Sequence, residues 1–207
     1  MTRQLIFSLT GFLVLTALTF CGDSHKRTDN EIKALLDSSL AAYLANVDTS
    51  RQATIDCVRG RPEPVVKNNI FPKTTFTFLS DSSIAFEIIE FDNGDNLVIT
   101  HSGCEYYVLT FRFVTARFQN DTTNSKYWFE KALQLINESA KGIDAPIRLD
   151  SAITALTAYS NKTDTPKFRE EIDYGETEIR NFVSVDRVQK INDKRFSIEL
   201  TFAIGPL

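Results

Sequence analysis

Apolar residues recur every three or four positions in three stretches of the chain, which is the spacing of one helix face. The first stretch spans residues 29–45. Thr28, just before it, and Glu31 take the positions of a capping box. The second spans residues 124–140. The third, residues 151–159, is shorter and has Asp150 in place for an N-cap. We expect a helix at each.

Strand-like stretches, rich in Phe, Ile, Val, Tyr and Thr, fill much of the rest of the chain. They are residues 75–79, 84–91, 97–101, 105–118, 169–174, 178–191 and 195–204. Asn93-Gly94, between two of these stretches, is the dipeptide typical of a type I′ hairpin, and Ser102-Gly103 is a second turn candidate. These turns predict antiparallel meanders.

The alternation along residues 105–118 indicates how the sheet is covered. Tyr107, Leu109 and Phe111 share one face, while Thr110 and Arg112 lie on the other. We therefore expect one face of the sheet in the core and the other mostly in solvent.

The order of elements is helix, meander, helices, meander, which predicts an α+β fold with helices packed on one face of an antiparallel sheet or of two related sheets. We expect a single domain over residues 29–207, with two helix-plus-meander units, 29–118 and 122–207, as an alternative description. The tripeptide Leu-Thr-Phe occurs in both halves. In outline, this order resembles the tandem helix-plus-sheet units of β-lactamase-inhibitor-like proteins.

An uncharged apolar run, Leu5 to Phe20, follows the single basic residue Arg3 near the start of the chain. Its sixteen residues are fewer than the roughly 20 that a membrane-spanning helix needs. The layout is typical of a signal peptide over residues 1–20. An uncleaved membrane anchor is the alternative.

The residues that end this run, Leu18-Thr19-Phe20-Cys21, resemble the lipobox of bacterial lipoproteins. The resemblance implies that Cys21 carries lipid, with palmitate among its acyl chains, and becomes the new N-terminus. Residues 21–28 would then be a tether to the inner or outer membrane, with the domain facing the periplasm or the exterior. An ordinary signal peptide that leads to plain secretion stays open as an alternative.

Charge and cysteine content narrow the function classes. The net charge of −4, without a clustered basic excess, argues against nucleic-acid binding. If Cys21 carries lipid, Cys57 and Cys104 remain as a pair in an oxidising compartment, so we expect a disulfide between them. Two buried free thiols are the alternative.

Catalytic chemistry has few candidates in this sequence. His101, beside Ser102, is the one histidine outside the tether, and we interpret it as a turn residue rather than a base. Carboxylates cluster over residues 87–95 and 170–178, without the regular ligand spacing of a calcium loop. We interpret them as turn formers and solvated residues, and predict no cofactor and no metal site.

Two features suggest binding. The loop from Arg59 to Pro64 carries Arg59 and Arg61 and is stiffened by two prolines, which lowers the entropy cost of recognition. Trp128, in an aromatic triplet, is either an interface anchor or a core residue.

The sequence thus favours a lipid-anchored, non-catalytic binding or assembly protein with a protein or glycan partner in the cell envelope. An envelope enzyme-inhibitor or immunity-type factor is one alternative. A glycan hydrolase that uses paired carboxylates is another.

Overall fold

The computed structural model describes residues 34, 37, 60–79, 83–175 and 179–205. The expected helix over residues 29–45 lies almost wholly outside this set. The described strands and helices are β1 Thr74–Phe78, β2 Ala85–Glu90, β3 Asn96–Ser102, β4 Tyr107–Thr115, α2 Ser125–Ala140, α3 Leu149–Lys162, β5 Ile172–Asp173, β6 Asn181–Lys190 and β7 Phe196–Ile204.

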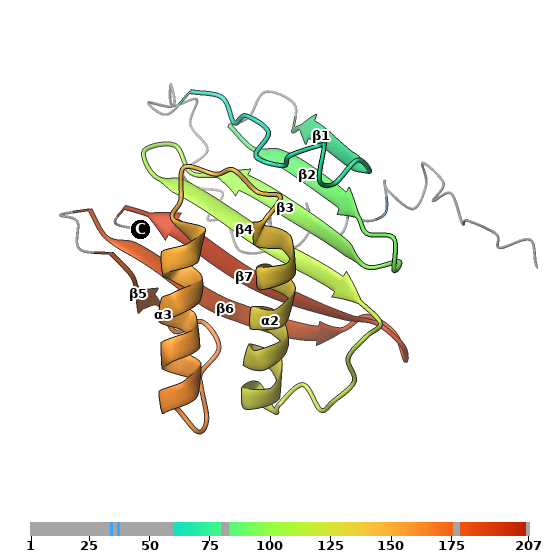
Figure 1. Ribbon diagram of the computed structural model, residues 1–207, viewed down its shortest axis with the longest axis vertical. Helices are drawn as coiled ribbons and strands as arrows, with labels where there is room; N and C mark the ends of the chain where they lie inside the picture. The colour runs from blue at the N-terminus through green and yellow to red at the C-terminus, as the bar shows by residue number, and fades with distance from the viewer. Residues whose placement is uncertain (1–33, 35–36, 38–59, 80–82, 176–178, 206–207) are drawn as a thin grey trace, which may run out of the picture.

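The described strands form one antiparallel sheet of seven strands in the order β1-β2-β3-β4-β7-β6-β5. Both helices lie side by side on one face of this sheet (Figure 1). The α+β fold with helices on one face is therefore confirmed. The two halves share a single sheet, because β4 pairs along its whole length with β7.

The main core lies between the helices and the sheet. Its fully buried side chains come from alternate positions of β3, β4 and β7 and from the inner faces of α2 and α3: Leu97, Ile99, Leu109, Phe111, Leu200, Phe202, Phe129, Ile136 and Leu156. The rings of Phe111 and Phe202 meet edge to face at 5.1 Å. Burying each such side chain contributes about 1.5–3 kcal/mol, so this layer holds the fold together.

The opposite face of the sheet is not the solvated surface that the sequence predicts. Phe86, Ile88 and Val98 form a second apolar cluster there with Ile84, and each is buried. The error has a physical cause: four of the six residues of β2 are apolar and they occupy both of its faces, as in strands covered on both sides. The expectation of solvent rested on Thr110 and Arg112 of β4, which cover only one part of this face.

Two local predictions are corrected by the backbone. Asn93 does not adopt the positive φ of a type I′ turn, whereas Gly94 does, at 82°. The amide of Gly94 donates to the carbonyl of Phe91 at 3.0 Å, so Asp92 and Asn93 form an ordinary β-turn that is followed by a left-handed glycine. Asp150 lies inside the first turn of α3 rather than at its N-cap.

A polar group on the face opposite the helices escapes the sequence analysis. The pairing of β6 with β7 is irregular between Val185 and Arg187, and Asp186 lies at this irregularity. Its carboxylate accepts hydrogen bonds from the hydroxyls of Ser184, at 2.5 Å, and Thr201, at 2.6 Å. Burial nevertheless dominates and raises the pKa of Asp186 above its ordinary value.

The raised pKa predicts how stability depends on pH. The folded state holds the Asp186 proton more tightly than the unfolded chain does. The free energy of unfolding therefore falls as pH rises from the ordinary carboxyl pKa through the raised one. Asp186→Asn removes this loss and keeps partners for both hydroxyls. Its melting temperature relative to the parent protein should therefore rise as pH increases from the ordinary carboxyl pKa of 3.8 up through the raised pKa of Asp186.

Asp193→Asn provides a control of opposite sign. Lys190 hydrogen-bonds Asp193 and lowers its pKa, so this carboxylate stabilises the fold above its unfolded pKa and loses that effect as pH falls through the folded one. Asp193→Asn should lose a little stability relative to the parent as pH rises. Parallel behaviour of the two variants in melting curves would contradict the assignment for Asp186.

Candidate functional site

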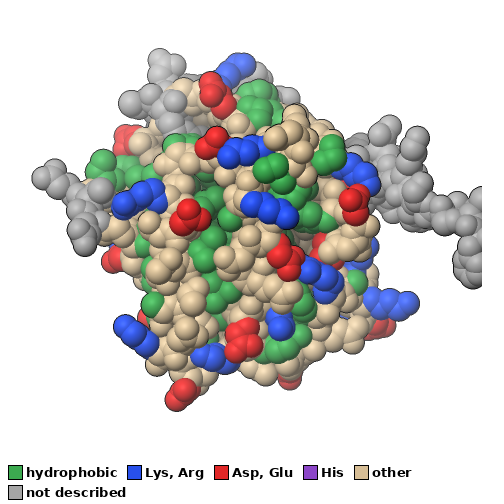
Figure 2. Space-filling model, viewed as in Figure 1, with side chains coloured by type: hydrophobic (Ala, Val, Ile, Leu, Met, Phe, Trp, Pro, Cys, Tyr) green, Lys and Arg blue, Asp and Glu red, His purple; other side chains and the backbone are tan. Residues whose placement is uncertain are grey.

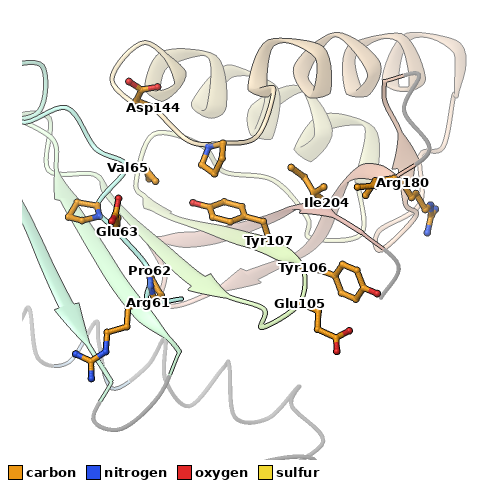
Figure 3. Close-up of a pocket in the computed structure, with 13 residues that line it drawn as sticks. Arg61, Pro62, Glu63, Val65, Glu105, Tyr106, Tyr107, Asp144, Arg180 and Ile204 are labelled. Carbon is orange, nitrogen blue, oxygen red and sulfur yellow. The ribbon is translucent and has the colours of Figure 1, made fainter. Parts of the chain in front are cut away.

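A pocket of about 840 Å³ opens at one end of the sheet. Four separate parts of the chain form its walls (Figure 3). They are residues 61–65, the β3–β4 connection with the start of β4 at residues 105–107, the α2–α3 connection at residues 144 and 146, and the adjoining ends of β6 and β7 at residues 179, 180 and 204. No one segment could make this pocket alone.

A buried carboxylate fixes the first wall to the sheet. Glu87 of β2 accepts hydrogen bonds from the backbone amides of Val65, at 3.0 Å, and Val66, at 3.1 Å. The same carboxylate lies 3.3 Å from Nε2 of His101 on β3. Glu87 is 1% exposed and His101 is fully buried, so these bonds form away from water, where they are strong.

The α2–α3 connection holds the same wall from its other side. The amide of Lys67 donates to the carbonyl of Gly142 at 2.8 Å, and the amide of Asp144 donates to the carbonyl of Val65 at 2.7 Å. A side chain at Gly142 would collide with the ring of Phe71, which explains glycine at this close approach. Residues 65–67 are thus held on both sides, and this places Arg61 to Pro64 at the pocket.

Aromatic and aliphatic groups line the interior. In Figure 3 the ring of Tyr107 extends into the pocket, with Val65 on one side and Ile204 on the other. Gly205 leaves room for the ring of Tyr106, since a Cβ at this glycine would overlap it. Gly205 also has φ of 114°, a backbone conformation that other residues rarely adopt.

The charged groups at the rim differ in how they are paired. Arg180 donates to Glu171 at 2.5 Å and to Asp173 at 2.7 Å, and these hydrogen bonds raise its pKa. Among the described residues, no basic group forms an ion pair with Glu63 or Glu105, and both are exposed. The pocket therefore offers two carboxylates that a ligand can engage.

Arg61 and Asp144 complete the rim. Arg61 lines the pocket, and its guanidinium lies 5.8 Å from the ring centre of Phe78 on β1, a residue that does not line the pocket. Asp144 lies 3.7 Å from Lys67 in an exposed ion pair, which holds this carboxylate only loosely.

On the face shown in Figure 2, acidic and basic side chains are interspersed.

The predicted binding residues fare differently. Arg61 lines the pocket, whereas Arg59 lies outside the described residues, as do Cys21 and Cys57. Trp128 is fully buried, and its indole N–H donates to the carbonyl of Asp121 at 2.9 Å, so it is a core residue and not an exposed anchor. Sequence alone does not fix which of three adjacent aromatic residues faces inward.

Cys104 is disulfide-bonded. The cysteine that we expect to pair with it lies outside the described residues, so the bond between Cys57 and Cys104 stays a prediction.

The carboxylate cluster over residues 87–95 does not form a site. Glu87 points into the core, Asp92 pairs with Lys73 at 2.8 Å, and Asp95 pairs with Arg117 at 2.7 Å. His101 lies within β3 and is buried against Glu87, so its interpretation as a turn residue is wrong. Within the ranges described, no three His, Cys, Asp or Glu side chains are grouped as metal ligands.

Most of the pocket residues were missed by the sequence analysis. Glu105, Tyr106, Asp144 and Arg180 line it from segments far apart in the chain, and none belongs to a recognisable motif. Only the proline-stiffened stretch at Arg61 gave a signal.

No helix in the described part of the chain has the length and apolar character to cross a membrane. Comparisons with family models, with curated proteins and with solved structures each found no match.

Proposed function

We propose that this chain is a non-catalytic binding or assembly protein that holds a partner in the pocket at the end of the sheet. The observation that carries this proposal is the preformed wall: Glu87 and the α2–α3 connection hold residues 65–67 before any ligand arrives. Preorganisation of this kind lowers the entropy cost of binding. An apolar interior with a few polar groups at its rim is also typical of ligand sites.

The chemistry of the pocket favours a protein segment as the partner. Tyr107 and Ile204 offer contacts to an apolar side chain, and the carboxylates of Glu63 and Glu105, at different edges of the pocket, each offer a partner to a basic group of the segment. A cationic group could also lie against a tyrosine ring. An envelope enzyme-inhibitor or immunity-type factor would use the same surface, with an enzyme as its partner.

The proposed place of action is the bacterial cell envelope. Lipid on Cys21 would anchor the chain, and residues 21–28 would tether the domain to the membrane surface. Because one acyl chain binds membranes only weakly, the several chains of a bacterial lipoprotein anchor would be needed for stable attachment.

Two exposed isoleucines allow a matched test of the pocket. Ile179 lines the pocket and is 56% exposed, whereas Ile191 is 46% exposed and lies at the start of the β6–β7 connection. A photoreactive phenylalanine analogue at position 179 of the full chain should cross-link one defined envelope protein. The same analogue at position 191 should not. Charge reversal by Glu63→Arg with Glu105→Arg should reduce the cross-link at position 179 several-fold without a shift in melting temperature.

Equal cross-linking from positions 179 and 191, or an unchanged cross-link after charge reversal, would rule out the pocket as the binding site. The control variant is Glu130→Arg, which alters an exposed carboxylate on α2 that does not line the pocket.

One observation favours the glycan hydrolase as a second candidate, because Glu63, Glu105 and Asp144 all line one pocket. Hydrolases of this kind need two carboxyl groups that face each other across the bond to be broken. In Figure 3 the three carboxylates lie at different edges of the pocket and do not converge. Release of soluble sugar fragments from cell-wall glycan, lost in Glu63→Gln, would establish the hydrolase instead.

A further inference from the structure

Strand β1 forms one edge of the described sheet and pairs with β2 (Figure 1). Among the described residues, no segment pairs with its other side. In an antiparallel strand, alternate residues direct their N–H and C=O groups to opposite sides, so part of the β1 backbone has no strand partner within the described part of the chain. Such an edge is a template for another strand.

Proteins usually protect an edge strand by a charge, a proline, a bulge or a covering element. The five residues of β1, Thr-Thr-Phe-Thr-Phe, contain neither charge nor proline. Their register with β2 is regular. Two cations lie near the strand: Lys73 is paired with Asp92, and the Arg61 guanidinium lies 5.8 Å from the ring centre of Phe78. The Phe78 side chain is nevertheless 43% exposed. By contrast, the opposite edge strand β5 has only two residues and packs against α3.

The sequence of β1 is also complementary to itself. If two copies pair in antiparallel fashion about Phe76, this residue lies opposite its own copy, and Thr75 lies opposite Thr77. Aromatic pairs and threonine pairs are both favourable across strands, and no like charges meet. The rings of Phe76 and Phe78 already contact each other at 5.1 Å, so the two copies would join four rings on the helix-bearing side.

We propose that β1 pairs with β1 of a second copy of this chain, in antiparallel fashion and centred on Phe76, to join two sheets into one. The inference is independent of the pocket and its ligand. A pair of five-residue strands is a small contact, below the roughly 1,200 Å² of a standard stable interface. The dimer is therefore weak, and its population rises with protein concentration.

Two exposed threonines provide the test. Thr75 and Thr77 are exposed, so substitution there leaves the core intact. Thr75→Lys with Thr77→Lys would place lysine opposite lysine twice in the proposed register. Thr75→Lys with Thr77→Glu would instead place lysine opposite glutamate twice. The two variants therefore change the same positions with opposite effects on pairing.

Sedimentation equilibrium of the full chain in mild detergent, over a concentration series, measures the outcome. The parent protein should approach twice its monomer mass at high concentration. The double-lysine variant should stay monomeric, and the lysine–glutamate variant should regain the dimer. Melting curves should show that both variants are folded.

A cross-linking experiment checks the register. A Thr75→Cys chain mixed with a Thr77→Cys chain should form a disulfide between copies, because directly opposite residues lie about 4.5–5.5 Å apart. Thr75→Cys alone should not, since its own copy would be about 8 Å away. A monomer at all concentrations, or a dimer that persists in the double-lysine variant, would overturn the proposal.

Discussion

Glu87→Ala should lower the free energy of unfolding by about 3–5 kcal/mol. The substitution strands two buried backbone amides, those of Val65 and Val66, and leaves the buried imidazole of His101 without its partner. Each buried donor that loses its acceptor costs about 1–3 kcal/mol. Urea denaturation measures the loss, and hydrogen exchange at the amides of Val65 and Val66 should accelerate together with it.

Two variants separate the loss of the Glu87 hydrogen bonds from a general effect of removing a charge. Glu87→Gln keeps the shape but has one oxygen where two accepted hydrogen bonds, so it should cost less, about 1–3 kcal/mol. Glu130→Ala removes an exposed carboxylate of α2 and should change stability by no more than about 0.5 kcal/mol. If Glu87→Ala proved as mild as Glu130→Ala, the wall would be held by the α2–α3 connection alone.

Trp128→Ala should lower the free energy of unfolding by about 3–5 kcal/mol, because it leaves a cavity between α2 and β7. The indole is fully buried, and its ring centre lies 4.9 Å from that of Phe196. Its N–H donates a hydrogen bond to the carbonyl of Asp121. Thermal or urea denaturation measures the loss.

The matched variants for this site are Trp128→Phe and Phe78→Ala. Trp128→Phe keeps most of the ring and loses only the indole hydrogen bond to the Asp121 carbonyl, which still accepts from the amide of Asn124 at 3.0 Å, so it should cost less than alanine. Phe78→Ala removes a ring that is 43% exposed and should cost less again. A Trp128→Ala protein that stays as stable as the parent would contradict the core assignment.

The fold followed from local patterns because hydrophobic periodicity is a local property of the chain. The alternation in residues 195–204 predicts β7 almost to its ends, and the stripe in residues 124–140 predicts α2. The burial of a side chain that depends on neighbours in space was harder to predict. The burial of Phe86 on the second face and the inward turn of Trp128 depend on packing that no short window of sequence contains.

The pocket shows the same limit more strongly. The two prolines next to Arg61 marked one wall, since their effect on the backbone is local. Glu105 and Asp144 reach the pocket only because β4 pairs with β7 and because α2 returns the chain to residues 65–67. Glu87 looked like one more surface carboxylate, and nothing in the sequence marks it as the acceptor for two distant amides.

The central place of β4 next to β7 also governs how this chain can fold. Their hydroxyl contact between Thr110 and Thr201 joins residues 91 positions apart at 3.1 Å. The hairpins β1–β2–β3–β4 and β6–β7 close short loops, but the joint between them must bring distant parts of the chain together. Contacts of such high sequence separation are slow to form. Until β7 is in place, β4 is a second unprotected edge, so the slow step of folding is also the step at which this chain is most prone to aggregate.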